Sequence, residues 1–110
     1  MVNTKEFRVV FVSTESYDNA LLIAKILISE NIAACCTVIP NIKSFFGWQG
    51  TLVERNENLI IAKTSEANLN ILESRVTELH TDEVPEIISL PLSESSSGYL
   101  SWMQLAIGDR

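Results

Sequence analysis

Four acidic or imidazole side chains follow one another closely in the second half of the chain. His80, the only histidine, is followed by Asp82, Glu83 and Glu86. An imidazole beside carboxylates can bind a metal ion or act as a general base, with Glu83 or Glu86 supporting the ring. A loop histidine can equally pack at a subunit contact or interact with the C-terminus of the preceding helix. Both interpretations remain open from the residues alone.

Two adjacent cysteines, Cys35 and Cys36, form the second candidate for chemistry. Neighbouring strand residues point to opposite faces, so a disulfide between them is not expected. Thiolates suit a soft ion such as Cu(I), but small buried strand residues are also often cysteine. One chain has no set of four ligands at zinc-site spacing, so a soft-metal site would need ligands from several subunits. A cysteine–histidine enzyme would require Cys35 and His80 to meet in space.

Enzyme signatures are otherwise missing from the sequence. It contains no GxSxG, no HExxH and no glycine-rich phosphate loop, and it has only four glycines. We therefore predict that the protein is not an enzyme.

Trp48 is expected to lie at an interface, because tryptophan is enriched at protein interfaces.

The composition indicates a globular protein rather than a disordered one. The chain has 110 residues, 46% of them hydrophobic, and 14 acidic against 8 basic side chains give a formal charge of −6. This balance argues against nucleic-acid binding, which needs clustered lysine and arginine. We see neither a signal peptide nor an apolar run long enough to span a membrane. We expect a single cytoplasmic domain covering residues 1–110.

Hydrophobic periodicity predicts the elements that must position these residues. Residues 7–14 have apolar side chains on both faces and predict a central strand. A stripe at helical spacing predicts a helix over 17–29, capped by Thr14 or Ser16. Further elements are predicted at 33–46 (strand), 51–63 (strand), from Thr64 or Ser65 to Leu79 (helix), 84–92 (strand) and 99–107 (short helix). This β-α-β-β-α-β order predicts a ferredoxin-like α+β sandwich, with both long helices on one face of the sheet.

The central hairpin is predicted to be unusually long. Pro40 is expected to mark a bulge, bend or edge, residues 45–50 the tip, and residues 56–58 a bulge or an exposed stretch. Arms longer than the usual five to six residues would project beyond the domain and leave unpaired strand edges. Another copy of the chain, in a closed ring, is the expected cover.

Several spaced motifs resemble the CutA family of divalent-cation tolerance proteins. They are Ala33-Ala34-Cys35, Ile39-Pro40, Ser44, Trp48-Gln49-Gly50, Glu54, Lys63-Thr64, His80, Glu83-Val84-Pro85-Glu86-Ile87-Ile88, Leu90-Pro91 and Tyr99-Leu100-x-Trp102. Together they cover almost the whole chain. Four positions depart from the family pattern: Thr81-Asp82 stands where Pro-Tyr is expected, Phe46 where a tyrosine is expected, and Thr37 where asparagine is common.

The resemblance implies a homotrimer in which hairpin strands pair between subunits. It further implies a role in tolerance of divalent metals, copper especially, with metal bound at clefts between subunits. Carried over residue by residue, the implied ligands are Cys35, His80 and Glu86, with Glu83 as a further candidate. The cation would be copper or another divalent ion and would not be required for folding. The alternative is a trimer similar to PII-type signalling proteins, which binds a small effector or a partner in those clefts.

Overall fold

The computed structural model, described here for residues 1–108, contains a four-stranded antiparallel sheet. Its strands are β2 (Phe7–Thr14), β3 (Cys35–Trp48), β4 (Thr51–Ser65) and β5 (Glu86–Pro91), in the spatial order β3-β4-β2-β5. The two crossovers hold α1 (Tyr17–Ser29) and α2 (Leu69–Leu79), the latter preceded by the 3-10 turn η1 (Glu66–Asn68). The predicted ferredoxin-like order is confirmed.

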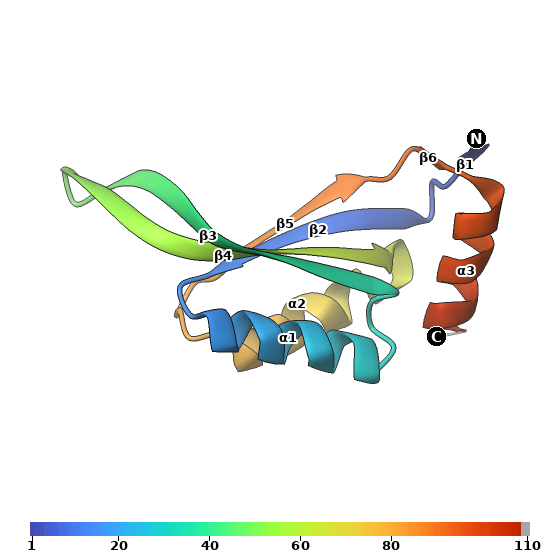
Figure 1. Cartoon of the computed structure of the whole chain (residues 1–110), viewed down its shortest axis with the longest axis horizontal. Helices are drawn as coiled ribbons and strands as arrows, with labels where there is room; N and C mark the ends of the chain where they lie inside the picture. The colour runs from blue at the N-terminus through green and yellow to red at the C-terminus, as the bar shows by residue number, and fades with distance from the viewer. Residues whose placement is uncertain (109–110) are drawn as a thin grey trace.

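Both long helices cover the same face of the sheet (Figure 1). On that face, side chains of β2 and β4 alternate inward and pack against apolar stripes of α1 and α2. The core consists of Val10, Val12, Ala20, Ile23, Leu27, Ile32, Ala33, Ile60, Ala62, Leu72 and Val76. As predicted, Ser16 caps α1: its hydroxyl accepts a hydrogen bond from the Asn19 N–H at 3.1 Å. Thr64 is not a helix cap. It lies in β4, where its hydroxyl donates to the Ile32 carbonyl at 2.6 Å.

The β3–β4 hairpin projects well past the two helices, to the left in Figure 1, and gives the molecule its 46 Å long axis. Pairing shifts between Ile39 and Ile42, so the bulge is at Pro40 and Asn41 on the edge strand, as the proline predicted. The expectation for residues 56–58 was partly right: Asn56 is exposed and Asn58 lies opposite the bulge of β3, but all three residues belong to β4, and Glu57 and Asn58 are buried. The tip is also shorter than predicted, because pairing continues to Trp48.

The hairpin turn consists of Gln49 and Gly50, both with positive φ (50° and 78°). Two consecutive left-handed residues fit a type I′ turn, whose preferred sequence is Asn-Gly. Glutamine tolerates this conformation less well than asparagine does. We expect Gln49→Asn to raise the free energy of unfolding by about 0.5 kcal/mol, in the range of other relieved backbone strains. A lower melting temperature for Gln49→Asn than for the parent would contradict this reading of the turn.

The end of the sheet opposite the hairpin is covered by α3 (Ser97–Ile107), at the right of Figure 1. Phe7, Ala34, Met103 and Ile107 are buried there. The segment before α3 is rich in serine. It contains β6 (Glu94–Ser95), which pairs with β1 (Val2–Asn3) in a separate two-stranded sheet. Two-residue strands leave no periodicity for sequence analysis to detect.

Within residues 1–108, no helix covers the centre of the other face of the main sheet (Figure 1). Paired residues on this face include Val9 with Leu90 and Phe11 with Ile88. Ile39, Ile88 and Leu90 remain 40–47% exposed, although they are large and apolar. A contiguous apolar surface of this kind is typical of an interaction site. We call it the open face.

Candidate functional site

A cleft of about 740 Å³ lies where the projecting hairpin leaves the sheet. One wall is apolar and comes from the hairpin, with Phe45, Phe46, Trp48 and Val53. The rest of the lining is polar except for Val84, and it comes from β2, β3, β4, the loop between α2 and β5, and the first residue of β5. The polar lining residues are Ser13, Ser44, Arg55, Glu57, Asp82, Glu83 and Glu86. A cleft of this size can accommodate a small molecule.

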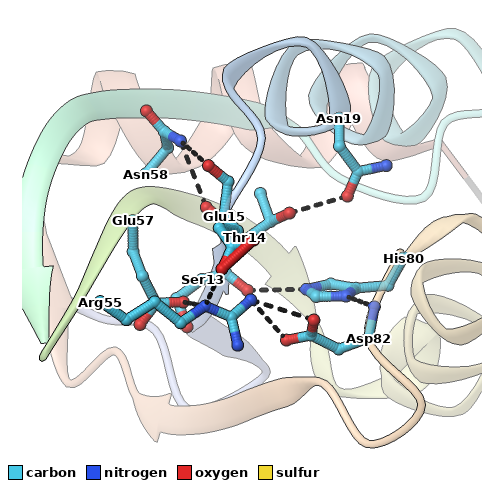
Figure 2. A network of polar contacts seen from close by, with 9 residues as sticks. All are labelled: Ser13, Thr14, Glu15, Asn19, Arg55, Glu57, Asn58, His80 and Asp82. Carbon is cyan, nitrogen blue, oxygen red and sulfur yellow. Dashed lines mark hydrogen bonds and ion pairs between the residues drawn. The ribbon is translucent and has the colours of Figure 1, made fainter. Parts of the chain in front are cut away.

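Arg55 on β4 joins the three chain segments that meet at the base of the cleft (Figure 2). Its Nη2 donates to both carboxylate oxygens of Asp82, at 3.0 and 2.9 Å. Its Nε lies 3.1 Å from Glu15 and 3.8 Å from Glu57. The Nε–H is not aligned for a hydrogen bond with either, so these two contacts are charge attractions only. A single guanidinium therefore neutralises part of the charge of three carboxylates.

These carboxylates keep Arg55 in its charged form. The hydrogen bond that Arg55 donates to Asp82 raises the pKa of Arg55 most, burial opposes the rise, and the nearby charges of Asp82, Glu15 and Glu57 add to it. Because its charge is already compensated, Arg55 offers little attraction to a free anion in the cleft.

His80 fixes the loop that carries Asp82. The ring is buried, and its Nδ1 accepts a hydrogen bond from the Asp82 N–H at 2.9 Å. Since Nδ1 must be unprotonated to accept, the proton is on Nε2, which donates to the Ser13 carbonyl at 2.7 Å. Both nitrogens of the neutral imidazole are thus used within the protomer.

Buried asparagines tie the same loops to the helices. Asn58 donates to the carbonyls of Thr14 and Glu15, and Asn19 donates to the carbonyl of Leu79 at 2.9 Å. Sequence analysis did not select Arg55, Asn58 or Asn19. The available signal was the run of polar residues from Glu54 to Asn58 inside an otherwise apolar strand, which marks side chains held by specific partners.

The chain is similar to known proteins along most of its length. The family model described as CutA1 divalent ion tolerance protein matches residues 8–106. The chain belongs to the CutA family. It is 40% identical over 96 residues to the divalent-cation tolerance protein CutA of Thermus thermophilus, covering 87% of this chain and 93% of that protein. It is 33% identical to the human protein CutA over 86% of this chain, but spans only 52% of that protein's length. It likewise spans 53% of chloroplastic CutA from Arabidopsis thaliana.

Solved CutA structures share the whole fold. CutA1 from Oryza sativa superposes with a TM-score of 0.92 at 33% identity, covering 94% of this chain and 95% of that one. The Thermus thermophilus protein gives a TM-score of 0.89 at 38% identity, covering 93% and 99%. The expected family and the α+β fold are thereby confirmed.

The structure distributes the four predicted metal ligands over different places. Glu83 and Glu86 line the cleft. His80 lies behind it, with both ring nitrogens engaged, so it would coordinate a metal only after giving up one hydrogen bond. Cys35 lies at the far end of β3, where the Lys63 ammonium is 3.9 Å from its sulfur. No three His, Cys, Asp or Glu side chains among residues 1–108 gather to hold a metal. The ligand assignment stays a prediction.

The Thr81-Asp82 departure from the family pattern has a structural counterpart in this chain. Asp82 supplies both the carboxylate that pairs with Arg55 and the N–H that binds His80. The loop is therefore held by an ion pair where the family pattern would place a tyrosine. The exchange changes the charge of the cleft as well as its shape.

Cys36 contrasts with its neighbour, because it packs against the core on the helix side of the sheet. Burial raises the pKa of the Cys36 thiol to about 12, the charge of Cys35 adds to the rise, and Lys63 partly offsets it. The folded state therefore binds this proton more tightly than the unfolded state. The resulting stabilisation is complete below pH 9 and is lost as pH rises from 9 towards 12.

We expect the thiol of a Cys35→Ser variant, in which only Cys36 remains, to resist a disulfide reagent at pH 8.5. The thiolate is the reactive form, and burial suppresses it. The free thiol should become titratable only after denaturant is added, and absorbance of the released reagent measures this. Rapid reaction of the folded variant would contradict the assigned burial.

No helix within residues 1–108 is both long and apolar enough to cross a membrane. Relatives are named for different compartments: the Arabidopsis protein is called chloroplastic, and a structural neighbour from Archaeoglobus fulgidus is called periplasmic. The expected cytoplasmic location stays a prediction.

Proposed function

We propose that this CutA-family chain acts in divalent-cation tolerance as a homotrimer that binds copper or another divalent cation at clefts between subunits. The names of its relatives describe cation tolerance rather than a reaction. The observation that carries the proposal is the cleft itself, where Glu83 and Glu86 sit beside Asp82 at the point where the hairpin projects from the sheet.

The trimer part of the proposal is supported by the surfaces that one protomer leaves uncovered. The open face is apolar, and the hairpin carries Phe45, Trp48 and Leu52 at 62–75% exposure. Burying surfaces of this kind against other copies is strongly favourable, because each large apolar side chain contributes about 1.5–3 kcal/mol. Closed rings also cover the edge strands β3 and β5.

The cation part rests on the chemistry of the donors. Carboxylate oxygens suit divalent ions, and Cu(II) also accepts imidazole nitrogen. One protomer brings together too few ligands for a closed site among its described residues. A bound ion would therefore need side chains from a neighbouring copy, which agrees with a cleft between subunits. His80 would contribute by holding the loop, or as a ligand after releasing the Ser13 carbonyl.

Light scattering and titration calorimetry with Cu(II) test the two parts separately. We expect a trimer, and we expect a Glu83→Gln/Glu86→Gln double variant to bind Cu(II) at least about tenfold more weakly, as for other losses at metal sites. Glu54→Gln is the matched control, because Glu54 lies on the same hairpin outside the cleft. A monomer in solution would overturn the first part. Equal Cu(II) binding by the double variant and the parent would overturn the second.

A second function is favoured by the size of the cleft. A volume of about 740 Å³ with an apolar wall exceeds what a bare ion needs and falls within the range of small-molecule sites. This supports the alternative of a trimer that binds a small effector. A thermal-shift screen of metabolites tests it, since a ligand that binds only the folded state raises the melting temperature.

A further inference from the structure

Glu57 is a buried carboxylate that the protomer leaves without a hydrogen bond. The residue is 7% exposed and lines the cleft. The one polar contact of its side chain with residues 1–108 is the ion pair with Arg55, at 3.8 Å, which is too long for a hydrogen bond. A buried ionised carboxylate normally accepts several hydrogen bonds. Glu57 thus has unused acceptor capacity at the base of a cavity.

The charge around Glu57 favours a positively charged ligand. Four carboxylates line the cleft, Glu57, Asp82, Glu83 and Glu86, against the single guanidinium of Arg55, which leaves a formal charge of −3. Arg55 is already hydrogen-bonded to Asp82. An anion would meet net repulsion, whereas a cation would be attracted.

The wall next to these carboxylates is aromatic. Val53, Arg55 and Glu57 alternate along β4 and therefore lie on one face of the hairpin. Phe46 pairs with Val53, and Trp48 pairs with Thr51, so their rings share that face. Aromatic faces attract organic cations and apolar groups, but they are poor ligands for a hydrated metal ion. The distance along the strand from Glu57 to Val53 is about 13 Å.

We propose that this cleft binds an organic cation, namely an ammonium group on an extended apolar or aromatic body. The ammonium N–H groups donate to Glu57 at the base, and the neighbouring carboxylates add charge. The apolar body lies along Val53 and Phe46 towards Trp48. The inference deepens the effector alternative above, and it rests on the same cleft.

The probe that tests this proposal is 4-phenylbutylamine, with 4-phenylbutyrate as a molecule of nearly the same shape and opposite charge. Binding is followed by titration calorimetry and by amide chemical shifts, in the presence of a chelator that removes divalent metals. We expect the amine to bind at least about tenfold more tightly than the carboxylate, because charged hydrogen bonds contribute that much or more. Benzylamine should bind more weakly than the longer amine, since it is too short to reach both Glu57 and the aromatic wall.

Two variants locate the binding site. Glu57→Gln preserves the shape of the side chain and should lower amine affinity about tenfold or more. Trp48→Leu, at a position that is 64% exposed in the protomer, should weaken the amine and the carboxylate alike. Because the same ring is a proposed subunit contact, this variant is compared with the parent only after light scattering shows the same oligomeric state. Glu54→Gln, on the opposite face of the same hairpin, should bind as the parent does.

Equal binding of the two probes, no binding of either, or an unchanged affinity in Glu57→Gln would each overturn the proposal. If Glu57→Gln fails to fold, the comparison of amine and carboxylate and the Trp48→Leu variant still decide it. Metal binding and trimer formation are measured on chelator-free samples of the same preparation, without probe. A failure of the cation-tolerance proposal can therefore be distinguished from a failure of this one.

Discussion

Replacing His80 by alanine is expected to lower the free energy of unfolding by about 2–4 kcal/mol, because it leaves one buried and one partly buried backbone group without partners. The Ser13 carbonyl would lose the donor at 2.7 Å, and the Asp82 N–H would lose its acceptor at 2.9 Å. A fully buried unsatisfied group such as the Ser13 carbonyl costs about 1–3 kcal/mol. The partly buried Asp82 N–H and the space left by the ring together add about 1 kcal/mol, because water can reach both. The loop between α2 and β5 would then no longer be fixed at the cleft.

Thermal unfolding at one fixed protein concentration measures this effect, since association would otherwise shift the transition. At about 4 °C per kcal/mol for a chain of this length, the melting temperature should fall by about 8–16 °C. Glu78→Gln, near the exposed end of the same helix, is the control and should melt close to the parent. If His80→Ala melts like Glu78→Gln, the ring is not the link between β2 and the loop.

Strong local periodicity made most of the fold predictable. The eight residues of β2, the stripe of α1 capped by Ser16, and the bulge at Pro40 each follow from a local rule, and the structure confirms them. The boundaries of the hairpin were harder to predict. Gly47 and aromatic residues at its end looked like a turn, but cross-strand pairing extends the strands as far as Trp48 and Thr51. Tertiary pairing overrides local propensity at such positions.

The candidate site was only half predictable, for a physical reason. Glu83 and Glu86 could be selected because acidic residues near a histidine are visible in the sequence, and both line the cleft. Arg55 and Glu57 lie in the middle of a strand and acquire their roles from partners 27 or more residues away or from burial. Whether His80 has a free nitrogen also depends on Ser13, which lies 67 residues away in the chain. No spacing rule contains such contacts.

Replacing Arg55 by methionine should cost about 2–3 kcal/mol of unfolding free energy at low salt. Removing one member of a buried ion pair costs about 3–5 kcal/mol. The expected cost is smaller here because the side chains of Arg55 and Asp82 remain 21% and 31% exposed, and solvent screens their charges. The loss arises because Glu15, Glu57 and Asp82 would face one another without a counter-charge. Repulsion of this kind is screened by salt, so the deficit should shrink between 0.05 and 1 M NaCl.

Arg75→Met is the matched control, because Arg75 also makes a two-pronged contact, to Glu30 at 3.0 and 2.8 Å, but on the surface. Exposed pairs contribute little, so this variant should melt close to the parent at every salt concentration. Equal melting of the two variants would mean that the Arg55 network is not a stabilising element.

The Arg55 variant also separates a stabilising role from a functional one. In the parent, the positive charge of Arg55 neutralises part of the negative charge of the cleft. Its removal should therefore strengthen the binding of a cation there while it weakens the fold. If Arg55 merely held the loop in place, its removal would lower the stability of the fold and the affinity for the cation together. Opposite changes in melting temperature and in affinity for 4-phenylbutylamine would identify Arg55 as the group that sets the charge of this cleft.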